Sequence, residues 1–227
     1  MENKNKIKIF FKIVSNVLFF VFVFCCSAVL IFNFVFEYHE VIGKSMAPTL
    51  NAEATSNEQS LDGVFIRKNA KIKTGDIIVA YNPITKKHVI KRLVGLDGDK
   101  IAIEKTSHGT QDAYRIILWK YGTSEPVLFK LNNQEYIESS ALYTDFYTEN
   151  TNKSFEYING LKFLVVPQNY LFYLGDNQST SSSSGDSADY GCNENIYYIG
   201  KVEYIIYGKT NFVWQILKQT FGRLYGK

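Results

Sequence analysis

The most prominent hydrophobic feature of the chain is an apolar run over residues 13–36, which contains no charged residue. At about 1.5 Å per residue, a helix of this length covers roughly 36 Å, which exceeds the ~30 Å hydrocarbon core of a bilayer. Lysines outnumber acids before the run, with Lys4, Lys6, Lys8 and Lys12 against Glu2, and Glu37 and Glu40 follow it. Because positive charge stays on the cytoplasmic side, we predict a single membrane-spanning helix with residues 1–12 in the cytoplasm.

A cleaved signal sequence and a lipoprotein anchor both fit this run less well. A cleaved signal sequence has an apolar region of about 7 to 15 residues that ends in small side chains, whereas this run is longer and ends in bulky residues. A lipid-modified cysteine at Cys25 would follow small residues, but Phe24 precedes it. The later apolar cluster at residues 212–217 is too short for a second crossing. We therefore expect a retained anchor in the cell membrane, with the rest of the chain outside the cytoplasm.

After the anchor, apolar positions fall into short runs rich in Val, Ile, Tyr and Phe, separated by turn residues. The runs lack helical periodicity, so they predict β-strands. A spacing of about a dozen residues is typical of an antiparallel β-barrel or β-sandwich, and the predicted fold class is mainly β. The expected strands are residues 63–67, 76–81, 88–95, 100–103, 113–119, 127–131, 161–165, 170–174 and 198–207.

The composition of the chain changes between residues 105 and 160. Asn, Ser, Thr and Tyr are frequent there, and the alternation of apolar and polar residues is weak. We interpret residues 105–160 as an inserted, non-catalytic β subdomain, so that residues 37–104 and 161–210 form the main β domain. The tail over residues 211–227 has the spacing of a short helix. That helix would either pack on the domain or lie on the bilayer surface.

Composition and spacing exclude several classes of function. The net charge of +3 is scattered along the chain beyond its first dozen residues, so no nucleic-acid partner is expected. The three histidines are not spaced as ligands and no cysteine cluster accompanies them, so no metal is expected. No glycine-rich phosphate loop is present, and no cofactor is expected. Cys25 and Cys26 are adjacent and Cys192 stands alone, so a disulfide framework is implausible.

The remaining chemistry is nucleophilic catalysis, for which Ser45 is a candidate. Gly43 would let the backbone approach a substrate closely, and Pro48 would stiffen the turn behind the serine. Taken alone, the segment is a weak signal and is more typical of a polar surface turn.

The candidate base is Lys91, in the strand predicted over residues 88–95. Alternation places Val89, Lys91 and Leu93 on one face and His88, Ile90 and Arg92 on the other. A lysine between apolar neighbours is often a residue at a sheet edge that extends its amine to water. If the amine is desolvated instead, its pKa falls and it can take a proton from a serine hydroxyl. His88, on the other face, is then not the base.

Four ordered motifs behind the anchor resemble those of bacterial type I signal peptidases, which are membrane-anchored serine proteases. The motifs are Ser45-Met46-x-Pro48-Thr49-Leu50, Gly75-Asp76-Ile77-Ile78-Val79, Lys91-Arg92-x-Val94-Gly95-Leu96-x-Gly98-Asp99, and Gly175-Asp176-Asn177 followed by Ser184-x-Asp186-Ser187. Their order and spacing, and the predicted topology of the anchor, agree with that family.

The resemblance implies a role for each matching residue. Ser45 would be the nucleophile and Lys91 its general base, and together they would form a Ser-Lys dyad. Ser184 would orient Lys91, although the long serine run leaves Ser182 or Ser183 as substitutes. Met46 would form part of the floor that contacts the substrate.

The resemblance also implies supporting contacts. Arg92 and Asp186 would form a structural ion pair, and Gly175, Asp176 and Asn177 would form the turn that brings the last motif into place. Two positions depart from the family. Ala188 replaces an arginine that would complete the ion pair, and Gly43 replaces a hydroxyl residue that donates to the oxyanion, so backbone N–H groups must supply more of that stabilisation.

The expected function is therefore that of a membrane-bound serine endopeptidase that removes signal peptides from exported preproteins through an acyl-enzyme intermediate. Its partners would be signal-peptide-bearing preproteins and the lipid bilayer. Two alternatives stay open: a relative specialised for a single substrate, and a catalytically silent anchored binding module.

Overall fold

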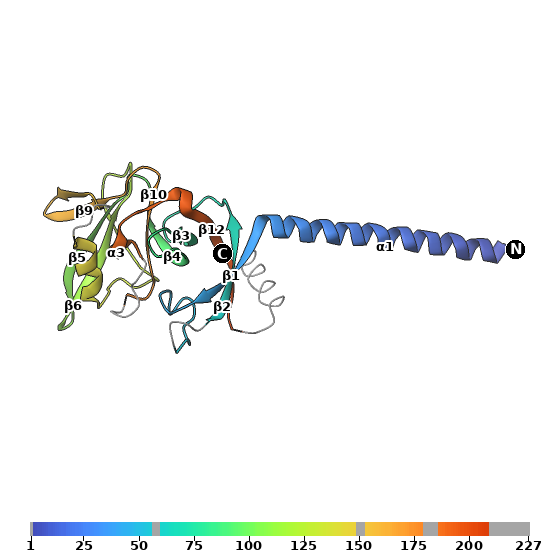
Figure 1. The fold of residues 1–227 in the computed structure, drawn as a ribbon, viewed down its shortest axis with the longest axis horizontal. Helices are drawn as coiled ribbons and strands as arrows, with labels where there is room; N and C mark the ends of the chain where they lie inside the picture. The colour runs from blue at the N-terminus through green and yellow to red at the C-terminus, as the bar shows by residue number, and fades with distance from the viewer. Residues whose placement is uncertain (1, 56–59, 149–152, 179–185, 209–227) are drawn as a thin grey trace. The chain divides into compact units, whose positions relative to one another are not determined.

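The computed structural model describes residues 2–55, 60–148, 153–178 and 186–208, with side chains from residue 9 onward (Figure 1). The chain divides into two compact units, Met1–Glu37 and Tyr38–Lys227. The predicted tail over residues 211–227 and the serines at 182–184 lie outside the described residues.

The first unit is essentially one helix, α1 (Glu2–Val35). Its apolar part, Ile9–Val35, is 27 residues long, starts earlier than predicted and is long enough to cross a membrane. The two polar side chains Ser27 and Asn33 each donate to the carbonyl four residues earlier, at 2.8 Å. An apolar surrounding requires such internal hydrogen bonds, since no water is there to replace them. The predicted apolar helix is confirmed, whereas its orientation stays a prediction.

The second unit contains two β-sheets, so the predicted mainly β fold class is confirmed. The larger sheet has the strand order β1-β2-β12-β3-β4-β10-β11 and the smaller one β7-β6-β5-β9-β8. The strands of the larger sheet are β1 (Phe36–Ile42), β2 (Ser60–Lys68), β3 (Ile77–Asn82), β4 (Lys87–Gly95), β10 (Tyr170–Leu174), β11 (Asn193–Glu194) and β12 (Tyr198–Ile206). Those of the smaller sheet are β5 (Lys100–His108), β6 (Gln111–Trp119), β7 (Val127–Phe129), β8 (Phe155–Ile158) and β9 (Leu161–Val165).

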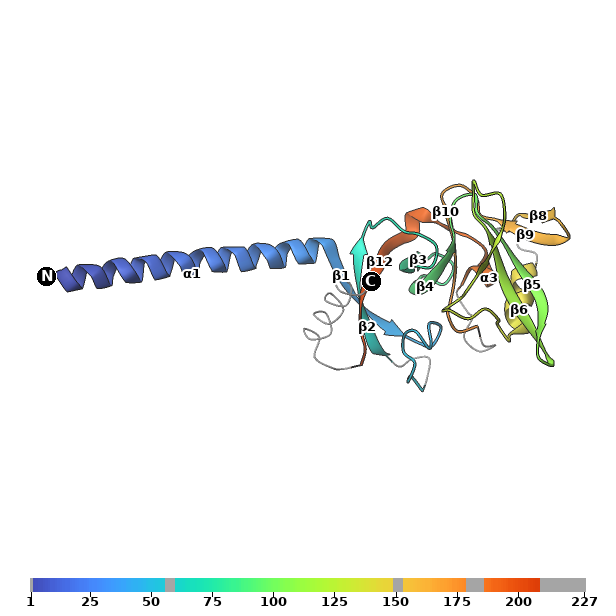
Figure 2. The ribbon, with the colours of Figure 1, turned by 180° about the vertical axis from the view of Figure 1, so that it is seen from behind.

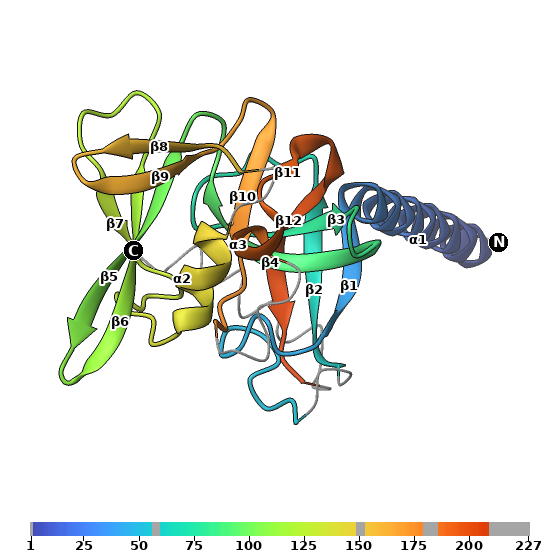
Figure 3. The ribbon, with the colours of Figure 1, turned by 60° about the vertical axis from the view of Figure 1, so that its left-hand side comes forward.

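All nine predicted strands are present, and the structure adds β1, β8 and β11. It also contains the helices α2 (Ser140–Tyr147) and α3 (Ser187–Tyr190) and a 3-10 turn, η1 (Asn195–Tyr197). The reverse view in Figure 2 shows the β8–β9 hairpin beside β5, and Figure 3 shows α2 close to β5 and β6.

The two sheets share one hydrophobic core. Val94 of β4 and Phe172 of β10 pack in the same cluster as Ile101 of β5 and Ile116 of β6. The smaller sheet begins at Lys100 and ends at Val165, so β5 and β9 belong to it. The smaller sheet therefore extends beyond residues 105–160 on both sides, and the predicted inserted subdomain over 105–160 stays a prediction.

The sequence analysis missed α2 because the helix lacks the usual local signals. Its buried face consists of Leu142 and Phe146, spaced four residues apart. Its first turn has no acidic residue, its last turn has no basic residue, and the Ser139 side chain does not cap it. The helix forms because these two side chains complete the shared core.

A tight hairpin joins β3 to β4 and sets the position of Lys91. The Asn82 side chain accepts hydrogen bonds from the backbone N–H groups of Ile84 and Thr85, at 2.9 and 3.1 Å, which closes the turn. The resulting register places Lys91 opposite Ile78. Since the register fixes which face each side chain takes, it directs Lys91 away from the face of Arg92.

Candidate active site

The segment that carries Ser45 follows the end of β1 and is held in place by buried contacts. Gly43 has a φ of 88°, which permits the sharp exit from the strand. Met46 and Leu50 are each 1% exposed and pack in a core cluster between the strands. The buried Asn51 side chain donates to the carbonyls of Val41 and Gly43, at 2.6 and 3.1 Å. We did not predict Asn51, because nothing in its local sequence marks this role.

Lys91 is a buried cationic side chain, with only 2% exposure. Burial disfavours the charged form of the amine and lowers its pKa, while the negative charges of Asp186 and Asp176 oppose that shift. Burial has the larger effect. The alternative of an amine extended to water at a sheet edge is excluded.

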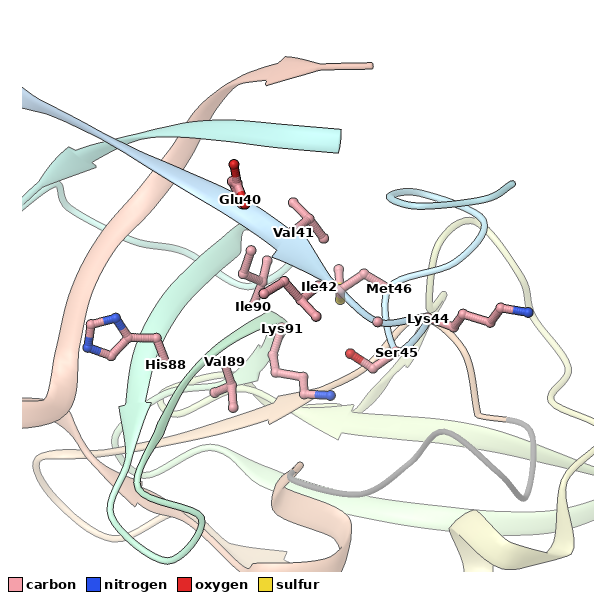
Figure 4. Close-up of a pocket in the computed structure, with 11 residues that line it drawn as sticks. Glu40, Val41, Ile42, Lys44, Ser45, Met46, His88, Val89, Ile90 and Lys91 are labelled. Atoms are coloured by element: carbon pink, nitrogen blue, oxygen red, sulfur yellow. The ribbon is translucent and has the colours of Figure 1, made fainter. Parts of the chain in front are cut away.

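Ser45 and Lys91 line the same pocket, which has a volume of about 360 Å³. Its walls come from residues 40–46 and residues 88–91, and Gly43 and Met46 are among them. Figure 4 shows the Ser45 hydroxyl and the Lys91 amine directed toward one another, whereas the His88 ring points away.

No hydrogen bond joins the Ser45 hydroxyl to the Lys91 amine within the described part of the chain. Catalytic hydrogen bonds of unliganded enzymes often tighten only when substrate binds. The Ser45 backbone N–H likewise has no acceptor among the described residues, so it is available to a ligand.

The serine segment is also held by a turn formed by Gly175, Asp176 and Asn177. We call this turn the clamp. The Asn177 backbone N–H donates to the Ser45 carbonyl at 3.0 Å, and its side-chain amide donates to the Lys44 carbonyl at 3.2 Å. The sequence interpretation assigned these residues only to the turn before the last motif. The structure adds a direct contact with the backbone of the candidate nucleophile.

We expect Gly175→Ala to lower kcat/KM by about 100-fold, because misplacement of a nucleophile by about 1 Å has an effect of that size. A Cβ atom at Gly175 would lie 2.5 Å from the Ser45 carbonyl oxygen and 3.3 Å from the Lys91 Nζ. The serine backbone would have to shift. Initial rates of the catalysed reaction measure the effect.

Gly95→Ala is the matched control for this substitution. Its Cβ would also crowd a neighbour, at 2.7 Å from the Ile101 side chain, but away from the serine segment. If both variants lose the same activity at equal loss of thermal stability, the effect is general overpacking and the clamp is unimportant.

The predicted ion pair between Arg92 and Asp186 is wrong. Arg92 instead binds Asp176, with its Nε 2.7 Å from Oδ1 and its Nη2 2.6 Å from Oδ2. The Asp176 side chain is fully buried and also accepts a hydrogen bond from the Thr49 hydroxyl. The reason is strand alternation, which turns Arg92 to the face opposite Lys91, where Asp176 lies.

Asp186 lies near Lys91, and its negative charge acts on that amine. The carboxylate is 1% exposed and accepts hydrogen bonds from Gly175 N–H at 3.3 Å, Gln178 Nε2 at 3.1 Å and Ala188 N–H at 3.1 Å. Burial raises the pKa of Asp186, against the effects of Lys91 and these donors. Ser184 lies outside the described residues, so its predicted contact with Lys91 stays a prediction.

Lys153 is a further cation near this region that the sequence analysis did not identify. Its amine donates to the carbonyls of Asp145 and Ala188, both at 2.6 Å, and so ties α2 to α3. Burial lowers the pKa of Lys153, while Asp189, Asp145 and Asp186 oppose this. A lysine from the predicted insertion thus lies beside the position where Ala188 departs from the family pattern.

Neither a metal site nor a reactive cysteine is indicated by the described residues. No group of three or more His, Cys, Asp or Glu side chains gathers there in a way that could hold a metal ion. Cys192 is buried, which raises its pKa to about 12. Such a thiol is unreactive near neutral pH.

Comparison with known proteins identifies similar sequences over most of the chain. The profile of the family described as "Signal peptidase, peptidase S26" matches residues 14–207. A "Signal peptidase I P" of Bacillus subtilis subsp. natto is 31% identical over 158 residues, which cover 69% of this chain and 70% of that protein. A "Signal peptidase I" of Bacillus caldolyticus is 29% identical over 196 residues, 86% of this chain and 92% of that protein. The crystal structure of a signal peptidase I from Enterococcus faecalis V583 aligns with a TM-score of 0.31 and 21% identity, over 59% of this chain and 98% of that one.

Proposed function

The chain belongs to the signal peptidase family, peptidase S26, as a type I signal peptidase, and we propose that Ser45 and Lys91 perform its cleavage of signal peptides. The protein is thus a serine endopeptidase that acts on signal-peptide-bearing proteins. The observation that carries the assignment of the two residues is the buried Lys91 amine, directed at the Ser45 hydroxyl in a pocket that a substrate can enter (Figure 4).

The pocket can receive a substrate as an added β-strand. Residues 87–92 of β4 pair with β3, whereas β10 pairs with β4 only at residues 92–95. In the described part of the chain, the other backbone edge of residues 88–91 therefore faces the pocket. An extended peptide would use such an edge for main-chain hydrogen bonds, and Ile42 and Ile90 would contact its apolar side chains.

The proposed first step is acylation. The neutral Lys91 amine takes the proton of the Ser45 hydroxyl as the oxygen attacks the scissile carbonyl carbon. The backbone N–H of Ser45 donates to the oxyanion that forms. Lys91 then gives its proton to the leaving amine as the peptide bond breaks, which leaves an ester between the signal peptide and Ser45.

The second step is hydrolysis of this ester. The neutral Lys91 amine removes a proton from a water molecule, which attacks the acyl carbon, and Ser45 leaves with a proton returned from Lys91. The signal peptide is released with a free carboxylate. One amine thus serves as base and acid in both steps.

The apolar helix α1 supports a membrane location for this chemistry. We propose that it crosses the cell membrane once, with its lysine-rich end in the cytoplasm and the β domain outside. Signal peptides are themselves apolar segments held by the membrane. Confining enzyme and substrate to one surface raises their effective concentration, so binding needs less affinity from the pocket itself.

The pH dependence of cleavage tests the role of Lys91. Its buried amine has a pKa below the ordinary 10.5, and only the neutral form accepts a proton. We expect kcat/KM to fall on acidification with a midpoint well below 10.5, as protons bind to Lys91. A midpoint at or above that ordinary value would exclude Lys91 as the base.

Asp186→Asn should shift this midpoint to lower pH, because the Asp186 charge stabilises protonated Lys91 and its removal lowers the lysine pKa further. Asp189→Asn, three residues later, is the matched control. Asp189 does not contribute to the pKa of Lys91, so its variant should keep the parent midpoint.

A further inference from the structure

Lys153 connects the helices α2 and α3 through backbone carbonyls. Its amine donates to the carbonyls of Asp145 and Ala188, both at 2.6 Å, and to the carbonyl of Thr148 at 3.3 Å. An ammonium group has three N–H donors, so these contacts can use all of them. Asp145 lies in the last turn of α2, Thr148 is its C-cap, and Ala188 lies in α3. Lys153 thus caps one helix and binds the other, and Figure 3 shows α2 and α3 side by side.

The helix α3 depends on such outside contacts for its position. It is four residues long, and an isolated helix shorter than about 12 residues is marginal in water. Its first residue, Ser187, is held by β10, because the Tyr173 backbone N–H donates to the Ser187 hydroxyl at 3.1 Å. Lys153 binds the next residue, Ala188, from the other direction. The amine therefore supplies a second fixed point for α3.

The same helix carries Asp186, the carboxylate that acts on Lys91. Asp186 is the N-cap of α3, and its Oδ1 accepts from the Ala188 N–H at 3.1 Å. Its negative charge acts on the buried Lys91 amine. Ala188 is thus bound at both backbone groups, with its N–H on Asp186 and its carbonyl on Lys153. One residue separates Lys153 from the carboxylate beside the proposed base.

Asp186 also connects α3 to the clamp. Its Oδ2 accepts from the backbone N–H of Gly175, the first clamp residue, at 3.3 Å. Gly175 lies against the proposed base, because an added Cβ there would be 3.3 Å from the Lys91 Nζ. A displacement of α3 would move the Asp186 carboxylate and loosen its bond to Gly175. Both changes would affect Lys91, one through charge and the other through position.

We propose that Lys153 is a positioning residue of the reaction, which holds the Asp186 carboxylate in place beside Lys91 by binding α2 to α3. This inference rests on the proposed function. Lys153 itself does not line the pocket that contains Ser45 and Lys91, so it acts through α3 and not on the substrate. It belongs to the stretch over residues 105–160 that the sequence analysis interpreted as non-catalytic. A part of that stretch would then assist the reaction.

A direct effect of the Lys153 charge on Lys91 would have the opposite sign. The ionisable groups that act on Lys153 come from α2 and from the segment around α3, and they are Asp145, Asp186, Asp189 and Cys192. Asp186 and Asp176 act on Lys91. Removal of a nearby positive charge would by itself raise the pKa of Lys91. Displacement of Asp186 would lower that pKa, because the carboxylate stabilises protonated Lys91.

The pH dependence of cleavage by the full-length protein in detergent tests the proposal. Lys153→Met keeps the length of the side chain and removes its three donors. We expect kcat for a preprotein to fall by about 10- to 100-fold with KM little changed, since a displacement of up to 1 Å has an effect of that size. The acid midpoint of kcat/KM should move to lower pH, as for Asp186→Asn. Added to Asp186→Asn, Lys153→Met should shift the midpoint no further.

Lys105→Met is the matched control, because it makes the same chemical change at a side chain that is 54% exposed and pairs with Asp112. It should keep the kcat and the midpoint of the parent. Lys153→Arg should keep most of the activity and the parent midpoint, since a guanidinium can donate to both carbonyls. If Lys153→Met does not fold, Lys153→Gln takes its place. Its amide keeps two donors and should give a smaller shift in the same direction.

The inference is overturned if Lys153→Met leaves the midpoint unchanged or raises it, even when thermal stability is lost. It is also overturned if the shift is as large in the Asp186→Asn background, or if Lys105→Met has the same effect. Failure of the proposed function looks different. In that case the parent protein cleaves no preprotein, or the Ser45→Ala variant cleaves as fast as the parent.

Discussion

Ser45→Ala and Lys91→Met should each lower kcat/KM for a preprotein by about 10⁴- to 10⁶-fold, and the double variant should be no slower than the slower single variant. Serine without its base is a poor nucleophile, and the amine without the serine has nothing to activate. The two effects therefore do not add. Methionine at position 91 preserves the packing of the lysine stem among its apolar neighbours, so folding is retained.

Rates measured in detergent with a purified preprotein provide this comparison, with circular dichroism as the check on folding. Lys87→Ala is the matched control, because Lys87 is an exposed residue of the same strand outside the pocket. Lys91→Arg should not restore activity, since guanidinium stays protonated even when buried. Additive losses, or a nearly normal rate for Lys91→Met, would contradict the proposed dyad.

Arg92→Met should destabilise the protein by about 3 to 5 kcal/mol, the largest stability effect that we expect. The substitution leaves the fully buried Asp176 carboxylate without the guanidinium that binds it through two nitrogens. An uncompensated buried charge accounts for most of the loss. Because the next residue, Asn177, holds the Ser45 carbonyl, activity should fall at temperatures where the protein is still folded.

Denaturant titration of the full chain measures this loss. Glu156→Gln breaks the ion pair with Lys100, in which the side chains are 51% and 31% exposed, and should cost less than about 1 kcal/mol. Arg92→Met combined with Asp176→Leu should recover part of the stability, because no buried charge is then left alone. If Arg92→Met costs no more than Glu156→Gln, the pair does not stabilise the site.

Strands and the anchor could be predicted because they depend on local patterns. Alternation of apolar residues identified β4, and the same alternation correctly placed Lys91 and Arg92 on opposite faces. The short helix α2 could not be predicted in this way. Its two buried side chains, Leu142 and Phe146, gain their stabilisation from a core formed by residues of both sheets.

The partner of Arg92 shows why the details of the site were harder to predict. Arg92 and Asp176 are 84 residues apart in the chain. Asp176 and Asp186 are both acids in the last motif, and no local pattern indicates which of them faces the arginine. The choice depends on how β10 continues past its pairing with β4, which only the folded chain defines.

The sequence by itself determined the apolar helix, nine of the strands and the choice of Ser45 and Lys91 as candidates, since periodicity and short motifs are properties of neighbouring residues. Only the tertiary structure decided the burial that lowers the Lys91 pKa, the clamp on the Ser45 carbonyl and the pairing of Arg92 with Asp176. Each of these arises between segments far apart in the chain. Desolvation and hydrogen bonding depend on distances in space, and the folded sheets set those distances.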